Sequence, residues 1–180
     1  MEKRIYKVAE IEETRKEAEE LLSRSLDDEI KERMKAVIEA EAPIRKALLY
    51  KRALNSFGLQ KVGSRLLSLF EELSLTLSFP TTLDGDGEVV FHKEEKEDFF
   101  RPSPSSALRY SYQIPHQEGA ACILYILETG DKPSLTKGEL YRLFLSEMGW
   151  EKSGRAIEEL FSYALKDKRI KRSGNGRFLK

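Results

Sequence analysis

The sequence predicts a mainly α-helical, α+β protein. It should consist of two winged-helix units in tandem, each a helix-turn-helix followed by a β-hairpin, with a helical extension at the N-terminus. The first observation is an internal repeat, since residues 46–70 align without a gap with residues 137–161 and nine positions are identical. Unrelated segments of average composition would share roughly one or two of these positions. The other two observations are the helical spacing of apolar residues and a Gly-rich turn after each repeat.

Residues 116–180, which we call unit 2, show the expected order of elements most clearly. Apolar residues over 120–127 recur at helical spacing, and this helix should end near Gly130. Thr136 stands three residues before Glu139, the spacing of a capping box, so a second helix should begin there. Gly149 is placed to end that helix in a left-handed conformation. The expected buried face of the second helix is Leu140, Leu143, Phe144 and Met148.

A third helix and a hairpin should complete unit 2. After a tight turn at residues 150–154, the inward-facing residues of the third helix are Ile157, Leu160, Phe161, Ala164 and Leu165. Beyond Lys168 the pattern changes to short extended pieces, Arg169–Arg172 and Arg177–Leu179. The Asn-Gly pair between them favours a hairpin turn. Helix, helix, turn, helix and hairpin is the order of a winged helix.

Residues 28–98, which we call unit 1, repeat this order. We expect helices over Ile30–Ala40, Lys46–Phe57 and Gly63–Leu77, and a hairpin formed by Phe79 with Val89–Phe91. The core-facing residues of the third helix are Leu66, Leu69, Phe70, Leu73 and Leu77. Leu67 and Leu75 lie off this face, so we expect them to meet a partner surface.

Two further segments complete the expected organisation. In residues 1–27 the densely charged stretch Glu2–Arg24 has one narrow apolar face. We therefore expect a helical extension that packs on the domain or meets a partner in a coiled coil. Residues 99–115 contain three prolines and four serines among aromatic residues. We expect them to form an extended linker whose aromatic side chains pack on one or both units.

The composition excludes several classes of protein. The 180 residues are 40% hydrophobic, with 31 Lys and Arg against 31 Asp and Glu, so the chain can bury a core. No stretch approaches the roughly 18 consecutive apolar residues of a membrane-spanning helix, and the charged start is unlike a signal peptide. We therefore expect a cytoplasmic protein that does not bind membranes. The residues Cys122, His92 and His116 are too few for a disulfide or a structural zinc site.

The sequence offers no catalytic or metal-binding pattern. Neither histidine lies in a motif that links a nucleophile to a base, so we expect no enzymatic activity and no cofactor. The acidic run over residues 84–88 is spaced like the start of a calcium loop, but Val89 stands where such a loop needs Gly. We expect a polar hairpin turn there, without a metal.

Basic charge gathers at the C-terminus. Residues 166–180 include seven basic residues and one acidic residue, a pattern that faces either a polyanion or water. In a helix-turn-helix protein the start of the third helix and the wing approach DNA. The expected DNA-contacting residues of unit 2 are Lys152, Ser153, Arg155, Lys168, Arg169, Lys171, Arg172 and Arg177. The expected DNA-contacting residues of unit 1 are Lys61, Ser64 and Arg65. DNA binding is less expected for this unit, because its wing is acidic.

Several short motifs in unit 1 resemble a known family. They read Glu41-Ala42-Pro43-Ile44, Leu49-Tyr50-Lys51-Arg52 and Gly58-Leu59-Gln60-Lys61-Val62-Gly63-Ser64-Arg65. They resemble the short uncharacterised domain near the C-terminus of large superfamily 1 DNA helicase-like proteins, which often also carry a restriction-endonuclease-like domain. That family usually has Gly at the position of Ala42. The resemblance covers roughly residues 30–180 and implies a module accessory to DNA transactions. We do not expect a helicase motor domain in this chain, because it lacks a Gly-x-x-x-x-Gly-Lys-Ser/Thr phosphate-binding loop.

Two functions follow as hypotheses. The first is a non-enzymatic DNA-binding module, acting mainly through unit 2 by phosphate contacts with little sequence selectivity. The alternative is an adaptor that docks onto a larger helicase or nuclease complex, with Leu67 and Leu75 in the protein interface. The sequence leaves open duplex against single-stranded DNA, any sequence preference, the oligomeric state and whether the chain is free-standing or a fragment.

Overall fold

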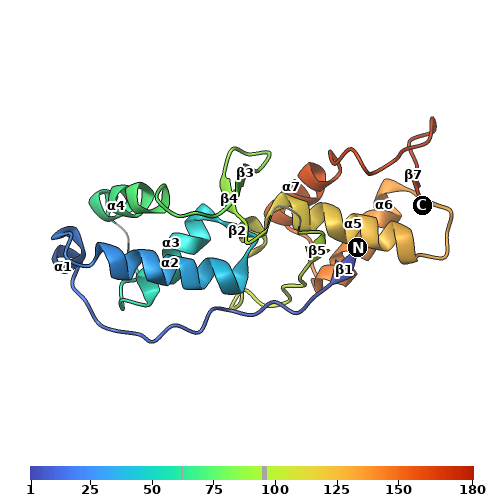
Figure 1. The fold of residues 1–180 in the computed structure, drawn as a ribbon. Coiled ribbons are helices and arrows are strands. Elements are labelled where there is room, and N and C mark those ends of the chain that lie inside the picture. The colour runs from blue at the N-terminus through green and yellow to red at the C-terminus, as the bar shows by residue number, and fades with distance from the viewer. Residues whose placement is uncertain (62, 95–96) are drawn as a thin grey trace. The chain divides into compact units, whose positions relative to one another are not determined.

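The computed structural model describes residues 1–61, 63–94 and 97–180, and it is a mixed α and β fold. Two compact bodies can be distinguished, and their elements are labelled in Figure 1. The N-terminal body consists of Lys7–Leu83 and Glu88–Glu95. The C-terminal body consists of Met1–Tyr6, Asp84–Gly87 and Lys96–Lys180. Each body has its own cluster of buried hydrophobic residues.

The N-terminal body combines four helices with a small sheet. Its helices are α1 (Ala18–Leu22), α2 (Asp27–Glu41), α3 (Lys46–Asn55) and α4 (Ser64–Ser74). Its strands are β2 (Ile44–Arg45), β3 (Thr81–Leu83) and β4 (Val89–Phe91), antiparallel in the order β2-β4-β3. The first hairpin strand therefore begins two residues after the expected Phe79.

The buried stripe of α4 explains where that helix packs. Leu66, Leu69, Phe70 and Leu73 are all at most 5% exposed and recur every three or four residues, as one face of a helix requires. Tyr50 of α3 meets this stripe with its ring edge against Phe70. Fully burying a Leu or Phe side chain contributes about 1.5–3 kcal/mol. This face therefore holds α4 against the buried core of the N-terminal body, where α1 and α2 are its main neighbours.

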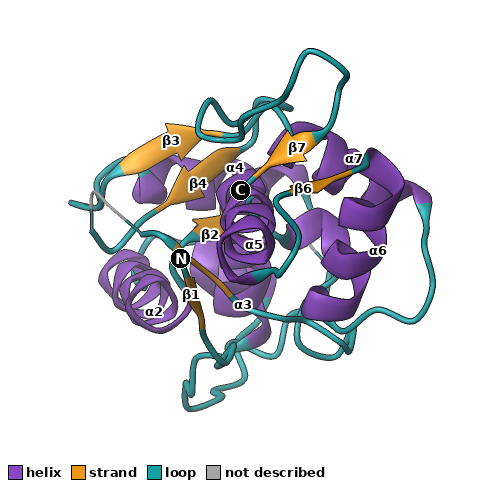
Figure 2. Cartoon of the chain, turned by 90° about the vertical axis from the view of Figure 1, so that its right-hand side faces the viewer, coloured by secondary structure: helices purple, strands orange, loops and turns teal. Residues whose placement is uncertain are grey.

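The C-terminal body is shown from its side in Figure 2. Its helices are α5 (His116–Thr129), α6 (Lys137–Met148) and α7 (Arg155–Ala164), with a short 3₁₀ helix η1 (Ser111–Gln113) before α5. Strands β6 (Ser134–Leu135) and β7 (Phe178–Leu179) are antiparallel, and Arg172 forms an isolated antiparallel bridge to Phe178. Strands β1 (Glu2–Lys3) and β5 (Phe99–Phe100) form a separate parallel pair.

The elements of the two bodies follow the repeat of the sequence. Helices α3 and α6 begin at Lys46 and Lys137, 91 residues apart, and helices α4 and α7 begin at Ser64 and Arg155 with the same offset. The glycines that follow α3 and α6 also correspond, since Gly58 has φ +74° and Gly149 has φ +81°. In each body a short strand also pairs with the last strand. Strand β2, just before α3, pairs with β4, and strand β6, just before α6, pairs with β7.

Several local predictions for unit 2 are confirmed. Thr136 caps α6 and accepts a hydrogen bond from Glu139 N (3.2 Å), while the Glu139 carboxylate accepts one from Thr136 N (2.8 Å). Helix α5 ends at the expected Gly130. The Asn-Gly turn forms, with Gly176 at φ +77°. The expected extended piece Arg169–Arg172 is reduced to the single bridge at Arg172, because residues 168–170 form a turn.

The expected N-terminal helix over Glu2–Arg24 is wrong except for its last turns. Only α1 is helical, and residues 4–17 are neither helix nor strand. A helix with so narrow an apolar face gains little from packing. Extended backbone instead reaches partners on the N-terminal body, as where Thr14 N donates to Ser56 O (2.9 Å). Two residues of this segment pack as partly buried neighbours of that core, Ala9 and Ile11.

Two further expectations need correction. Leu143 is 42% exposed instead of buried, because the buried residues of α6 are Leu140, Phe144 and Met148, one helical turn apart from each other. Residues 99–115, expected to link the two units, belong to the C-terminal body, and there Phe99 and Phe100 are buried, as expected for the aromatic side chains of this segment. The stacked rings of Tyr110 and Tyr112 are the exposed exception (5.3 Å between centroids).

Candidate nucleic-acid interface

The turn before α7 and the start of that helix carry the first group of expected DNA-contacting residues. Lys152, Ser153 and Arg155 are all exposed, and 92% of the Arg155 side chain faces solvent. Arg155 Nε pairs with Glu159 Oε1 (2.9 Å), one helical turn later. Ser153 donates to Glu158 Oε1 (3.0 Å). Of these three residues, Lys152 is therefore the cation that has no ion pair with a described carboxylate.

The hairpin and the turn before it carry the second group. Arg169 Nη1 and Nη2 pair with Asp98 (2.6 Å) and Asp167 (2.9 Å), and the hydrogen bond to Asp167 raises the pKa of Arg169. The same bond lowers the pKa of Asp167, so both groups are charged at neutral pH. The charge of Arg169 is thus balanced within the body.

The two arginines of the hairpin are held by neighbouring atoms. Arg177 Nε donates to Ser134 Oγ (2.8 Å) and Nη2 donates to Ser134 O (3.1 Å), which ties the hairpin to β6. Arg172 Nη2 donates to Leu165 O (3.2 Å), and its guanidinium lies 4.9 Å from the ring centre of Phe178. Arg172 keeps an exposed side chain and no carboxylate partner within the part of the chain that the structure describes.

Lys168 and Lys171 complete this surface. Both are exposed, and neither forms an ion pair with a described residue. Together with Arg172 they place three uncompensated cations within five residues of sequence. Neighbouring lysines without counterions attract polyanions, because binding a phosphate backbone releases the counterions that neutralise it. We call Lys168, Lys171 and Arg172 the wing cations.

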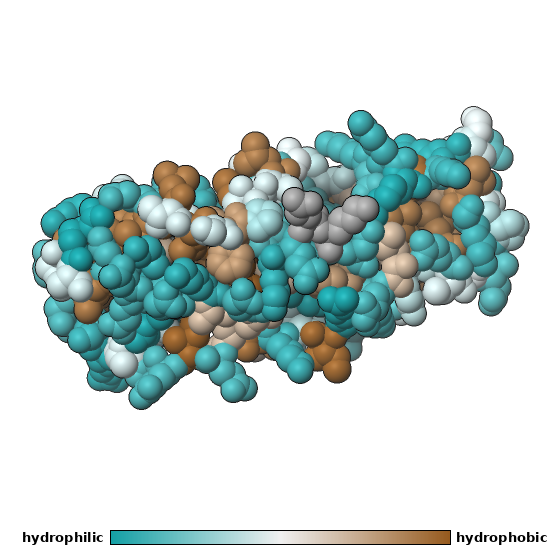
Figure 3. Space-filling model, in the orientation of Figure 1, coloured by the Kyte–Doolittle hydropathy of each residue, from teal (hydrophilic) through white to brown (hydrophobic). Residues whose placement is uncertain are grey.

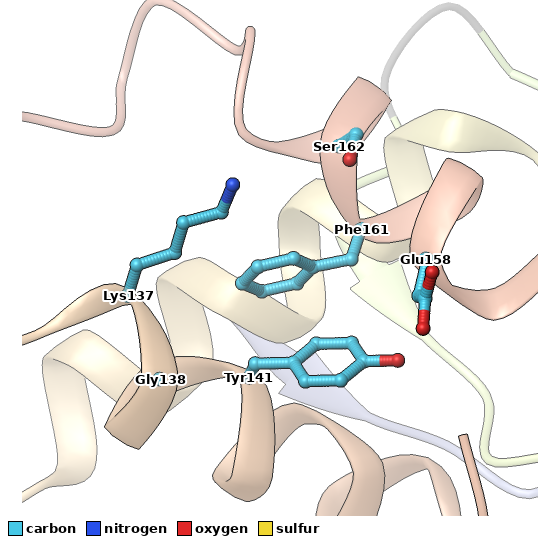
Figure 4. A pocket seen from close by; sticks show the side chains of 6 residues that line it. All are labelled: Lys137, Gly138, Tyr141, Glu158, Phe161 and Ser162. Atoms are coloured by element: carbon cyan, nitrogen blue, oxygen red, sulfur yellow. The ribbon is translucent and has the colours of Figure 1, made fainter. Parts of the chain in front are cut away.

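A shallow hollow lies between α6 and α7, beside the first group. Its volume is about 390 Å³, and its lining residues are Lys137, Gly138, Tyr141, Glu158, Phe161 and Ser162. Figure 4 shows Lys137 and Glu158 on opposite sides of the rings of Tyr141 and Phe161. The Tyr141 hydroxyl is hydrogen-bonded to Ser153, which links this hollow to the turn before α7. Lys137 and Glu158 place opposite charges at the two ends of the hollow. We interpret the hollow as part of the charged surface and not as a cofactor site.

The corresponding residues of unit 1 form a weaker surface. Lys61, Ser64 and Arg65 are exposed around the start of α4. Arg65 Nη1 lies 3.5 Å from Glu19 Oε1, and both side chains are more than 70% exposed. A surface pair of this kind contributes little to stability and is screened by salt. Val62, inside the motif that links these residues, lies outside the described residues.

The two leucines assigned to protein contact are exposed on α4 and at its C-terminal end. Leu67 is 46% exposed and Leu75 is 82% exposed, whereas Leu66, Leu69 and Leu73 beside them are buried. In Figure 3 brown apolar side chains interrupt the hydrophilic surface in the region of α4. An exposed leucine surrounded by charge adds apolar area that a partner can cover.

One group of side chains brings metal-ligand types together. Ligand atoms of Asp84, Asp86 and His116 lie within 4.8 Å of one another. These groups already have protein partners, since the Asp84 carboxylate accepts His116 N (3.1 Å) and His116 Nδ1 accepts Gly85 N (3.1 Å). The geometry is that of a cap on the first turn of α5. We therefore assign this trio a structural role at the start of α5.

A buried charge network is the feature that sequence reasoning missed. Glu118, at the start of α5, is fully buried and pairs with Arg101 (2.6 Å) and Arg109 (2.7 Å), which are also buried. Burial alone would raise the pKa of Glu118, but the two guanidinium charges and their hydrogen bonds together lower it to about 2. The sequence feature that could have indicated this network is a single acidic residue, Glu118, at the start of an apolar helix, with Arg101 and Arg109 in the Pro-rich segment before it.

Comparison with known proteins adds one match. A family model described as a protein of unknown function (DUF3320) matches residues 19–68, from α1 into α4. The matched part contains the motifs on which the family resemblance was based, but the description of that family model does not mention helicases. No curated protein and no solved structure matched the chain. Among the described residues, none of the helices combines the length and apolar character needed to cross a membrane.

Proposed function

We propose that both bodies are winged helices and that the C-terminal body binds DNA without sequence preference. Support for the fold comes from the strand pairing. Strand β2 before α3 pairs with β4, and strand β6 before α6 pairs in the same way with β7. Helix, strand, helix and helix follow in that order twice. A two-stranded hairpin completes the N-terminal series, and strand β7 with its bridge to Arg172 completes the C-terminal series. Such a unit presents its third helix and its hairpin to the duplex.

The wing cations carry the DNA-binding proposal. Most other basic side chains of the C-terminal body have oxygen partners, as Lys3 has with Glu147 and Arg169 with Asp98. Lys168 and Lys171, like Lys152 and Arg172, form no ion pair with a carboxylate of the described residues, and they lie three positions apart in and beside the hairpin. They would contact phosphates and supply affinity that falls with salt, while Glu158 and Glu159 on α7 disfavour close contact of that helix with phosphates. Neither role requires a catalytic group.

The test compares two double variants that lose the same charge. In Lys168→Gln/Lys171→Gln the affinity for duplex DNA should fall, and the slope of log K against log salt should decrease by about two. The matched control, Lys31→Gln/Lys35→Gln on α2, removes two cations that already pair with Asp28 and Glu32. Fluorescence anisotropy with labelled duplex and single-stranded DNA, at about 50 and 200 mM salt, measures the affinity of each variant and its salt dependence. Equal loss in the two variants, or no binding by the wild type, would contradict the proposal.

The N-terminal body suggests a second function, docking onto a larger helicase or nuclease complex. The observation in favour is the exposure of Leu67 and Leu75 on a body whose other leucines are mostly buried. Leu67→Glu/Leu75→Glu should leave DNA binding intact and abolish co-purification of a helicase or nuclease from cells, as identified by mass spectrometry. Ser68→Glu is the matched control, because it adds charge to the same exposed helix without removing apolar area. A partner retained equally by the leucine variant and the control would exclude this surface.

A further inference from the structure

The hollow between α6 and α7 combines aromatic walls with opposite charges at its two ends. Phe161 is 3% exposed, and its ring centre lies 4.9 Å from that of Tyr141. Lys137 and Glu158 lie on opposite sides of these rings, as Figure 4 shows. The volume of about 390 Å³ is at the small end of the roughly 300–1,000 Å³ of ligand sites. The hollow therefore suits a small, flat ligand that carries both a negative charge and a hydrogen-bond donor.

The acidic end of the hollow is held in place by a chain of hydrogen bonds. The Tyr141 hydroxyl is hydrogen-bonded to Ser153, and Ser153 donates to Glu158 Oε1 (3.0 Å). This chain fixes the carboxylate beside the ring of Tyr141 and uses one of its two oxygens. An ionised carboxylate can only accept hydrogen bonds. Glu158 Oε2 is therefore suited to accept a hydrogen bond from a ligand that lies on the ring.

The repeat in the N-terminal body has different groups at both ends of this position. Lys46, the counterpart of Lys137, pairs with Glu71 (2.7 Å). The C-terminal body has the uncharged Ser162 at the position of Glu71, so Lys137 lacks that counter-charge. Leu67 stands in the N-terminal body where the hollow has its carboxylate. A cation and an acceptor facing across two rings are thus particular to the C-terminal body.

We propose that this hollow holds one unpaired base of a single-stranded DNA extension, an assignment that rests on the DNA-binding function proposed above. The base stacks on the ring of Tyr141, its exocyclic amino group donates to Glu158, and the adjoining phosphate meets Lys137. Aromatic side chains bind unpaired bases by stacking, and carboxylates accept hydrogen bonds from the amino group of cytosine. Cytosine should therefore be preferred over uracil, because uracil has a carbonyl oxygen at the same ring position and the carboxylate repels it.

Duplexes with matched single-stranded extensions test the proposal on the full chain. Fluorescence anisotropy compares a blunt duplex with the same duplex carrying a short 3′ extension of cytosines or of uracils. The wild type should bind the cytosine extension about fivefold more tightly than the uracil extension, and the blunt duplex more weakly than either. Glu158→Gln should bring this ratio to about one, because an amide pairs with both bases. Glu159→Gln is the matched control and should keep the ratio, since it removes the same charge from α7 outside the hollow.

Gly138→Leu tests the space itself. Gly138 lines the hollow in the first turn of α6 and has open space around it, so a leucine side chain fits there and fills the hollow. Leucine also favours the helix more than glycine does, so the variant should fold. It should lose the gain in affinity from both extensions and still bind the blunt duplex. Ser146→Leu is the matched control, because it adds the same side chain at an exposed site of α6 outside the hollow.

The outcomes separate this proposal from the one on which it rests. A wild type that binds the blunt duplex and gains nothing from either extension would overturn the assignment of the hollow and leave duplex binding by the wing cations standing. Equal change of the cytosine-to-uracil ratio in Glu158→Gln and Glu159→Gln would also overturn it. Tight binding of the cytosine extension without binding of the blunt duplex would contradict the duplex proposal and support the hollow. No binding of any of these DNAs would overturn both.

Discussion

At the scale of single residues, the C-terminal body depends on charges that are buried and on a few backbone positions. Glu118 is surrounded by Arg101 and Arg109, so its charge is compensated inside the body. A buried ion pair adds little net stability compared with apolar packing, but removing one partner is costly because the other charge remains buried. Glu118 is therefore the position where one neutral substitution should have the largest effect.

Glu118→Gln should destabilise the protein by about 3–5 kcal/mol at pH 7, because two buried guanidinium groups lose their counterion. The folded-state pKa of Glu118 is about 2, below the ordinary value of 4.5. Its contribution is therefore fully present above pH 4.5 and is lost as the pH falls toward 2. Urea unfolding between pH 7 and 2 should show this loss in the wild type and not in the variant. The control Glu151→Gln, at an exposed site, should follow the wild-type profile.

Gly149→Ala should lower the free energy of unfolding by about 1–2 kcal/mol, because only glycine adopts a positive φ without strain. An added Cβ would also lie 2.9 Å from Pro104 Cβ. Gly138→Ala is the matched control, since that site in the first turn of α6 has open space around it. Alanine there should leave the protein as stable or slightly more stable. Thermal unfolding measures both, and equal effects would contradict this explanation.

At the scale of elements, helix α6 begins and ends where local chemistry dictates. Thr136 and Glu139 satisfy free N–H groups at the start of α6, and the left-handed Gly149 ends it. Such signals act within a few residues, so they can be read from a sequence. Leu143 shows the limit, because its spacing suits the buried face but no element covers it.

Thr136→Ala should cost about 1 kcal/mol by removing the cap of α6. Thr129→Ala provides the control, because the Thr129 hydroxyl only donates to Tyr125 O (2.7 Å) within α5 and caps no free N–H. Urea unfolding should give a loss for Thr136→Ala that is at least twice that for Thr129→Ala. A larger loss for the control would show that the capping box does not hold the start of α6.

At the scale of the whole molecule, the chain has two hydrophobic cores with no buried residue in common. The N-terminal segment contributes to both bodies, since residues 1–6 belong to the C-terminal body and Lys7 begins the N-terminal one. Separate cores can open separately, because the stability of a region follows from its own buried contacts.

Hydrogen exchange should therefore report the two bodies independently. Glu118→Gln should speed exchange of the amides in α5, α6 and α7 by at least tenfold and leave those of α2, α3 and α4 within about twofold. Leu69→Ala, which removes a buried side chain of α4, should do the reverse. Mass spectrometry of peptic fragments resolves these regions. Uniform acceleration by either variant would mean that the protein unfolds as one unit.

The candidate site could be predicted only in part from the sequence. The exposure of Lys152, Lys168 and Lys171 was expected, because lysines rarely lie buried without a partner. The ties of Arg169 to Asp98 and of Arg177 to Ser134 join residues 71 and 43 positions apart. Sequence spacing does not reveal such pairs. Which cations remain available to a ligand is thus decided by the folded chain.

The sequence by itself determined the repeat, the order of helices, the cap at Thr136 and the turns at Gly149 and Gly176. Each of these depends on apolar periodicity or on hydrogen bonds between residues close in the chain. Only the tertiary structure decided that residues 4–17 are extended, that Tyr6 meets two arginines and that Glu118 holds them. Each of these features depends on groups in different elements of the fold, from Arg109 and Glu118, 9 positions apart, to Ala9 and Glu41, 32 positions apart. Such tertiary contacts outweigh the weak local preference of a charged segment for the helix.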